Sequence, residues 1–168
     1  ITMDLAGHGE YTASQSKNWT IGNFGADVAA VVKDSGSQRV VLVGSSMGGP
    51  VALEAARRLP EQVVGIVGVD TFRELVTPFP PDQFEPLLAQ MRVDFPRTVA
   101  GFVGDHFFTD RTDPILKKWI VDDMSAAPPE VAIPAVVALM AMDYDPVLAE
   151  LDVPIIAVNS AGSPTDEA

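Results

Sequence analysis

The residues of this sequence that are best placed to carry chemistry lie in a glycine-flanked turn, residues 44–48, with the sequence GSSMG. This G-x-S-x-G pattern follows a β-branched run at residues 39–43 and precedes a helical pattern at residues 51–59. A strand, a sharp turn and a helix form the context in which such a serine stands exposed as a nucleophile. Ser46 would attack a carbonyl carbon, and the backbone N–H of Met47 would face the oxyanion that develops.

We expect glycine in this turn for a steric reason. Bulky residues there would collide with the adjacent strand and helix, and Gly49 would let a substrate approach the backbone closely. A glycine-rich connection that only joins a strand to a helix is the plainer interpretation, and it stays open. A phosphate-binding loop of the type G-x-x-x-x-G-K-[ST] is not present, because no lysine follows these glycines.

The elements that must position the turn alternate between helix and strand. Apolar residues recur at helical spacing over residues 18–35, with Asn18 as the candidate N-cap. Runs rich in valine and isoleucine at residues 39–43, 63–69 and 153–158 predict buried strands. We therefore predict an α/β fold, with a mainly parallel sheet and helices on both of its faces.

A long stretch between the last two predicted strands has a different character. Prolines punctuate its helical patterns, of which one covers residues 84–95, one starts at Asp113-Pro114 and one starts at Pro128-Pro129. We predict a core part at residues 1–70, an inserted helical cap at residues 71–147 and a return to the core at residues 148–168. Some large apolar residues of this stretch could line a pocket but more often form the core of such a cap: Phe102, Phe107, Phe108, Trp119, Met140 and Met142.

Composition excludes several function classes. The 168 residues carry 23 Asp+Glu against 11 Lys+Arg, and the basic residues are scattered singly, so no nucleic acid partner is expected. No apolar run approaches the roughly 20 residues of a membrane-spanning helix. Cysteine is absent, which excludes disulfides and thiolate chemistry but does not fix the compartment. Because the chain begins at Ile1 rather than at Met, we expect an internal part of a longer protein, with a processed or engineered terminus as the alternative.

Three segments, taken in chain order, resemble a known family. Residues 4–10 (DLAGHGE) fit a D-x-x-G-x-G loop, residues 44–49 (GSSMGG) fit a nucleophile turn, and residues 67–72 (VGVDTF) fit the end of a strand where a cap is inserted. In this order they resemble the α/β-hydrolases that carry a helical cap. The resemblance covers essentially the whole chain and implies a truncated α/β-hydrolase fold. It also implies that Ser46 is the nucleophile and that Met47 supplies one N–H of the oxyanion hole.

The resemblance implies a serine hydrolase that acts on a small-molecule ester or related acyl substrate through an acyl-enzyme. Haloalkane dehalogenases and epoxide hydrolases carry Asp at this turn, so Ser46 implies ester, thioester or C–C bond hydrolysis, acyl transfer or perhydrolysis. No metal and no organic cofactor is implied. A non-catalytic module that binds a small apolar ligand under its cap, or an inactive fragment of a hydrolase, is the alternative. The oligomeric state stays open.

The chain departs from the family at the histidine. The family places its general base after the eighth strand, and no histidine follows Val158 here. His106 falls inside the predicted cap, where we interpret it as a polar residue of a helical lid, and the resemblance gives His8 a structural place near the site. We therefore expect the general-base histidine, and the second oxyanion donor, to lie outside these 168 residues. Two histidines so far apart in sequence do not match the spacing of metal ligands.

The acid that would orient the histidine has two candidates. Family order, nucleophile then acid then histidine, favours Asp166, the first carboxylate after the strand at residues 153–158. Asp70, at the end of the strand at residues 63–69, is the alternative that some members use. In the plainer interpretations, Asp166 is a solvated tail carboxylate and Asp70 is a hinge residue that accepts backbone hydrogen bonds.

Overall fold

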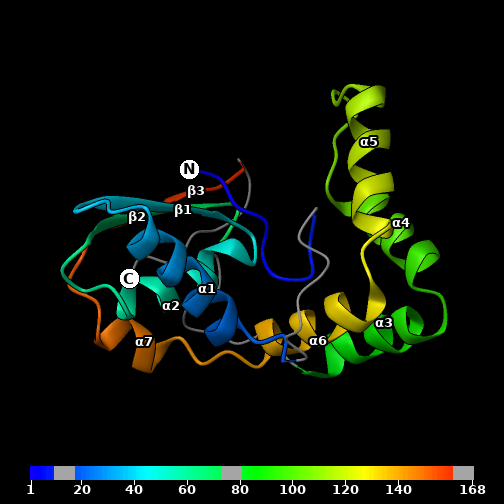
Figure 1. Ribbon diagram of the computed structural model, residues 1–168. Helices are drawn as coiled ribbons and strands as arrows, with labels where there is room; N and C mark the ends of the chain where they lie inside the picture. The colour runs from blue at the N-terminus through cyan, green and yellow to red at the C-terminus, as the bar shows by residue number, and fades with distance from the viewer. Residues whose placement is uncertain (10–17, 73–80, 161–168) are drawn as a thin grey trace.

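The computed structural model describes residues 1–9, 18–72 and 81–160, and it has a three-stranded parallel sheet, which lies at the upper left of Figure 1. The strands are β1 (Val40–Ser45), β2 (Val63–Val69) and β3 (Ile155–Val158), in the spatial order β1-β2-β3. In the register, Leu42 lies beside Ile66, and Ile66 lies beside Ile155. The predicted parallel sheet is confirmed.

Three helices pack against one face of this sheet: α1 (Ile21–Asp34), α2 (Gly48–Arg57) and α7 (Asp145–Ala149). The helix α1 begins after Thr20 rather than after the predicted Asn18, because the Thr20 hydroxyl caps the helix and accepts a hydrogen bond from the N–H of Asn23, at 3.2 Å. The helix α2 lies centrally beneath the sheet, and most of its residues are buried. The core therefore forms between α2, the sheet and the two flanking helices.

The alternation of side chains along the strands decides which residues reach that core. Leu42 and Ile66 point toward the helices and are buried. On the opposite face, Val43 is 68% exposed and Ile156 is 59% exposed. Within the described residues, helices thus cover one face, and the expectation of helices on both faces is met on one side only.

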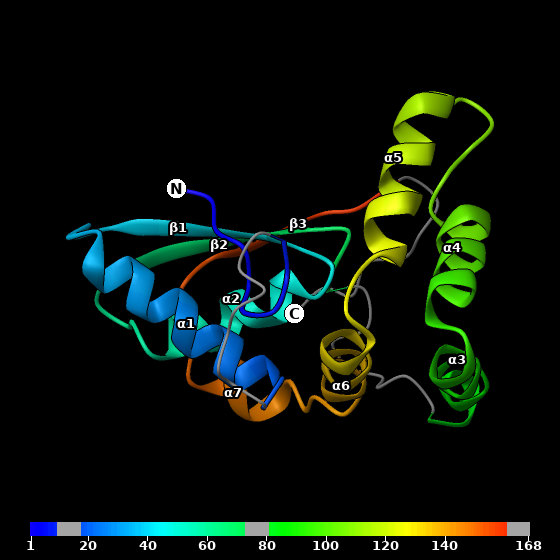
Figure 2. The same ribbon diagram turned by 45° about the vertical axis from the view of Figure 1, so that its right-hand side comes forward.

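In the described part of the stretch between β2 and β3, four helices precede α7 and form the insert: α3 (Pro81–Val93), α4 (Phe95–His106), α5 (Pro114–Ser125) and α6 (Pro129–Met140). They lie beyond the end of the sheet at which β1 leads into α2 (Figure 2). The starts predicted at Pro114 and Pro129 are confirmed. The pattern predicted over residues 84–95 breaks at Asp94, whose carboxylate accepts from the N–H of Arg97 at 3.2 Å, so Phe95 begins a separate helix.

The insert has a hydrophobic cluster of its own and one firm attachment to the sheet domain. Its fully buried members come from α3 and α4: Leu88, Met91, Phe95, Val99 and Val103. The helix α6 makes the attachment, because Ala135 is buried with Ile21 and Phe24 of α1 and with Val51 of α2. The division into residues 1–70, 71–147 and 148–168 stays a prediction.

The helix α5 stands away from the rest of the molecule (Figures 1 and 2). It packs against α4, buries none of its residues fully, and leaves Ile115 81% exposed and Trp119 64% exposed. Across the parts of the chain that the structure describes, no helix is long and apolar enough to cross a bilayer.

Candidate active site

Ser46 occupies the sharp turn between β1 and α2, and its side chain is exposed at the carboxyl end of the sheet. Its backbone has φ +49°, a left-handed conformation that is uncommon for a residue with a side chain. Two hydrogen bonds hold it there: the Ser46 N–H donates to the carbonyl of Val69 at 3.0 Å, and the Gly49 N–H donates to the carbonyl of Ser46 at 2.9 Å. The sequence prediction of a sharp strand–turn–helix is confirmed.

The three glycines around Ser46 differ in whether the fold requires them to lack a side chain. A Cβ on Gly44 would overlap the carbonyl oxygen of Gly48, so the turn closes only when residue 44 lacks a side chain. A Cβ on Gly48 would meet nothing within 4 Å, so the predicted collision does not apply there. A Cβ on Gly49 would lie 2.6 Å from the Thr71 hydroxyl oxygen. Gly49 therefore permits close packing against the turn after β2, a contact that the sequence analysis did not anticipate.

Met47 caps the amino end of α2 with its backbone. Among residues 1–9, 18–72 and 81–160, its N–H has no hydrogen-bond partner. The partial positive charge of a helix amino terminus adds to the field of such a free N–H. An oxygen that becomes negative beside Ser46 would meet a donor that is already oriented, as an oxyanion hole requires.

Neither histidine is placed as the partner of Ser46. His8 is half-buried in the loop before α1, with Nδ1 3.2 Å from the carbonyl oxygen of Ala6 and its ring edge-on to Phe24. His106 is exposed at the end of α4, where Nδ1 lies 2.9 Å from the carbonyl oxygen of Phe102. Within the described ranges, no hydrogen bond links either ring to Ser46.

The two candidate acids have different standing. Asp166 lies outside the described residues. Asp70 follows β2, exposed, with φ +46°, and its carboxylate accepts a hydrogen bond from the N–H of Ser160 at 2.8 Å. The amide oxygen of Asn159 accepts from the N–H of Thr71 at 3.1 Å. Asn159 was not predicted as a site residue, because only a carboxylate was considered after this strand. Its position directly after a buried strand could have indicated it.

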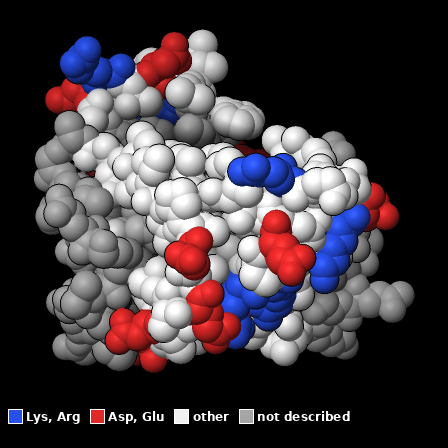
Figure 3. All heavy atoms as spheres, turned by 90° about the vertical axis from the view of Figure 1, so that its left-hand side faces the viewer, with Lys and Arg blue, Asp and Glu red and all other residues white. Residues whose placement is uncertain are grey.

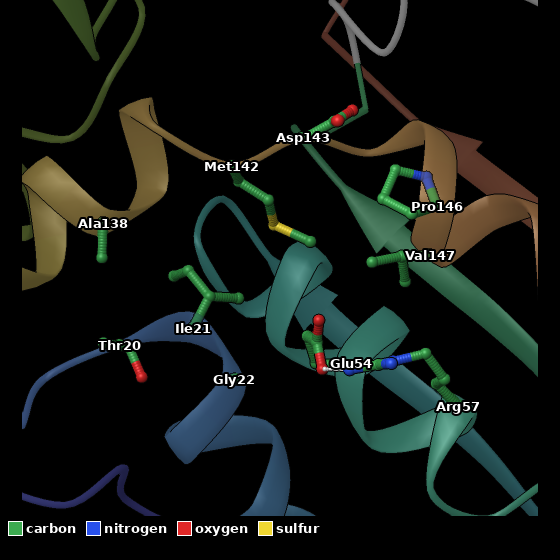
Figure 4. A pocket seen from close by; sticks show the side chains of 10 residues that line it. All are labelled: Thr20, Ile21, Gly22, Glu54, Arg57, Ala138, Met142, Asp143, Pro146 and Val147. Carbon is green, nitrogen blue, oxygen red and sulfur yellow. Dashed lines mark hydrogen bonds and ion pairs between the residues drawn. The ribbon is translucent and has the colours of Figure 1, made fainter.

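A cavity of about 370 Å³ lies among α1, α2, α6 and α7 (Figure 4), and Ser46 is not among its lining residues. Glu54 and Arg57 line it from α2 and bind each other at 3.0 Å, and Asp143 lines it as well. Arg58 also donates to Glu54. Burial opposes ionisation of Glu54, but the hydrogen bonds from Arg58 and Arg57 outweigh it and hold the pKa of this carboxyl below its ordinary value. Arg57 also lies 3.5 Å from Glu150, so two carboxylates balance the two guanidinium groups, and the cluster is best explained as structural.

Charges on the molecular surface are mixed in sign. On the face at which the amino ends of the strands lie, acidic and basic side chains are interspersed (Figure 3). Among the described residues on that face, no single-sign patch gathers, which agrees with the scattered basic residues of the sequence.

The large apolar residues of the insert divide between core and surface. Phe102 and Phe108 pack against the hydrophobic cluster of α3 and α4, as the core interpretation predicted. Phe107 and Trp119 are 53% and 64% exposed, so the core interpretation is wrong for these two. Met142 lines the cavity beside Glu54.

Comparison with protein families finds a match over residues 1–118 to the model described as alpha/beta hydrolase fold. A human mitochondrial palmitoyl-protein thioesterase, ABHD10, is 39% identical over 80 residues, which are 47% of this chain and 26% of that protein. Lipase LipV of Mycobacterium tuberculosis is 39% identical over 67 residues, which are 40% of this chain and 25% of the lipase. The aligned stretch thus spans about a quarter of these relatives.

Solved structures agree on the architecture. A hydrolase from Oleispira antarctica superposes with a TM-score of 0.81 at 17% identity, covering 95% of this chain and 62% of that one. An esterase from Exiguobacterium antarcticum superposes with a TM-score of 0.80 at 21% identity, covering 92% of this chain and 60% of the esterase. At such identities the likeness shows the fold.

Proposed function

Because this chain belongs to the α/β-hydrolase fold family, we propose that it carries the nucleophile of a serine hydrolase that cleaves ester or thioester bonds. One observation carries the proposal: Ser46 is exposed at φ +49° on a strand–helix turn, beside a Met47 N–H without a partner in the described residues. The two relatives named above, a thioesterase and a lipase, support an acyl substrate.

In the proposed reaction, the Ser46 Oγ attacks the substrate carbonyl as a general base removes its proton. The carbonyl oxygen becomes an oxyanion and accepts a hydrogen bond from the Met47 N–H. The bond to the alcohol or thiol breaks, the leaving group takes the proton, and an acyl-enzyme remains on Ser46. Water then attacks the acyl carbon and releases the acid.

We place the general base, a histidine, outside these 168 residues, because His8 and His106, the two histidines of the sequence, are both engaged with backbone carbonyls away from Ser46. We assign the acid that orients it to Asp166, because chain order favours Asp166 over the alternative, Asp70. The residue types in this scheme need no metal ion and no organic cofactor.

The inserted helices supply a cap over the substrate in this proposal. They lie beyond the end of the sheet at which β1 leads into α2, and two of their large apolar side chains, Phe107 and Trp119, remain exposed. Exposed apolar side chains on such an insert are suited to contact the acyl part of a substrate.

Ser46→Ala in the intact protein tests the proposal, with Ser45→Ala as the matched control, since both serines are exposed and adjacent. We expect Ser46→Ala to lower kcat for an activated ester by at least about 10³-fold, and Ser45→Ala to change it by less than about 10-fold. If wild type hydrolyses the ester no faster than Ser46→Ala, Ser46 is not the nucleophile, and if neither hydrolyses it faster than buffer does, the protein is a non-catalytic binding module.

A further inference from the structure

The carboxyl ends of β2 and β3 are joined by reciprocal hydrogen bonds just beside the strand that carries Ser46. The Asp70 N–H donates to the carbonyl of Val158 at 3.0 Å and continues the sheet. Beyond Asp70 and Val158, side-chain oxygens replace backbone carbonyls as the hydrogen-bond acceptors. The Asp70 carboxylate accepts from the N–H of Ser160 at 2.8 Å, and the Asn159 amide oxygen accepts from the N–H of Thr71 at 3.1 Å.

The turn that carries Asp70 is strained and tightly packed. Asp70 and Phe72 have φ values of +46° and +59°, which side-chain-bearing residues adopt only when their surroundings enforce it. Thr71 and Phe72 are buried, and they occupy the space that a Cβ on Gly49 would need. The turn after β2 therefore packs directly on the first turn of α2, the helix that follows Ser46.

These contacts make one continuous unit from the nucleophile to the end of β3. The Ser46 N–H is bonded to the carbonyl of Val69, the residue before Asp70. Asp70 in turn fixes Ser160, the last described residue of this segment. A displacement of the Asp70 turn would move Ser160 relative to Ser46.

We propose that Asp70 is a positioning residue, which with Asn159 fixes the start of the segment after β3 relative to Ser46, and that it is not the charged acid of the triad. The reciprocity supports this assignment. Asn159 performs the equivalent task for Thr71 without a charge, so the shared requirement is a hydrogen-bond acceptor. The inference rests on the proposed function.

The test compares Asp70→Asn with Asp70→Gly in the intact protein. Asn keeps an acceptor oxygen, loses the charge and tolerates positive φ, whereas Gly tolerates this φ but has no acceptor. We expect Asp70→Asn to keep kcat within about 5-fold of wild type, and Asp70→Gly and Asn159→Ala to lower kcat about 10- to 100-fold by misplacement of groups around Ser46.

The pH dependence of kcat/KM distinguishes a triad acid from a positioning residue, because loss of a positioning hydrogen bond does not shift the pH profile. A triad acid stabilises the protonated histidine, so its loss lowers the histidine pKa and shifts the acid limb of the profile to lower pH. We expect the acid limb to stay in place for Asp70→Asn. A loss of about 10³-fold or more in Asp70→Asn, with a shifted acid limb, would show that Asp70 is the charged acid and would overturn the inference.

Wild-type kcat in both Asp70→Gly and Asn159→Ala would also overturn it, because the bonds would then position nothing that catalysis needs. If Asp70→Gly does not fold, Asp70→Asn and Asn159→Ala still decide between the two roles. Failure of the proposed function is separate, since it appears as undiminished activity in Ser46→Ala, whatever the Asp70 variants do.

Discussion

At the scale of single residues, the site depends on how a serine is held in a conformation that it does not favour. The left-handed φ of Ser46 persists because the ladder bond to Val69 and the start of α2 fix the backbone on both sides. Gly44 makes this closure possible by having no Cβ. The contribution of the turn to stability can therefore be tested apart from its chemistry.

Gly44→Ala and Gly48→Ala form a matched pair for that test. We expect Gly44→Ala to lower the free energy of unfolding by about 3 kcal/mol, because its Cβ meets the backbone carbonyl of Gly48, which cannot move without opening the turn. Gly48→Ala should stay within about 0.5 kcal/mol of wild type, because open space surrounds its Cβ. Denaturant unfolding of the intact protein measures both, and similar losses would contradict the assigned geometry.

Much of the nucleophile turn could be predicted at this scale, and the bonds between the strand ends could not. The G-x-S-x-G pattern lies within five consecutive residues, so local sequence predicts its shape. The bond between Asp70 and Ser160 joins residues 90 positions apart. No local pattern encodes such a pairing, because it depends on two strands that meet only in the folded sheet.

At the scale of elements, α2 is the helix that connects the nucleophile to the rest of the molecule. Glu54 binds Arg57 and Arg58 on its own helix, and Arg57 reaches Glu150 at 3.5 Å, beside α7. The pair between Arg57 and Glu150 links the end of α2 to the segment that leads into β3.

The ionisation of Glu54 gives a pH-dependent stability. The pKa of this carboxyl is lowered in the folded protein, so its contribution is present above its unfolded pKa of about 4.3 and is lost as pH falls through the folded value. We expect Glu54→Gln to be about 1–2 kcal/mol less stable than wild type at pH 7, and the difference to shrink below about pH 4. Chemical unfolding across pH 3–7 measures it.

Glu150→Gln is the control for this experiment, because Glu150 is more exposed and lies farther from Arg57. Its effect should stay below about 0.5 kcal/mol at every pH. A Glu54→Gln difference that grows as pH falls would contradict the assigned sign of the pKa shift.

The exposed face of α5 separates a role in substrate binding from a role in stability. We expect Trp119→Ala to change the free energy of unfolding by less than about 0.5 kcal/mol, since its side chain is 64% exposed, but to raise KM for a long-chain acyl ester several-fold, roughly 3- to 10-fold. Val103→Ala is the contrast, because Val103 is 1% exposed and its loss should cost about 1–3 kcal/mol. An unchanged KM in Trp119→Ala would remove α5 from the proposed cap.

The helices of the insert show where element prediction succeeds. The starts at Asp113-Pro114 and Pro128-Pro129 carry proline in the first turn, a strong local signal. The start of α4 was missed because Phe95 extends the apolar spacing of the preceding helix. Asp94 caps α4, and Pro96 follows in its first turn, so the signal was present but the apolar periodicity concealed it.

At the scale of the whole molecule, the sheet is asymmetrically covered in the described residues. Val41, Val43, Ile156 and Val158 lie on the face opposite the helices, each more than half exposed. The strand sequence could not predict which face is covered. The residues of β1 are apolar on both faces, so its pattern does not distinguish a covered face from an exposed one.

An apolar face of this kind should bind a hydrophobic dye. We expect the 168-residue chain to enhance the fluorescence of an anilinonaphthalene sulfonate probe, and Val43→Thr with Ile156→Thr to reduce that enhancement at least about 2-fold without loss of stability. Leu42→Thr, on the buried side of β1, should instead destabilise the chain. Equal dye binding by wild type and the double variant would contradict the exposed placement of these side chains.

The most direct test of the central claim is covalent labelling of the intact protein with a fluorophosphonate, followed by intact-mass measurement and peptide mapping. The account predicts one adduct, located on Ser46, retained in Ser45→Ala and absent from Ser46→Ala. A folded and hydrolytically active protein whose adduct lies on another serine, or whose Ser46→Ala variant still labels, would show that Ser46 is not the nucleophile.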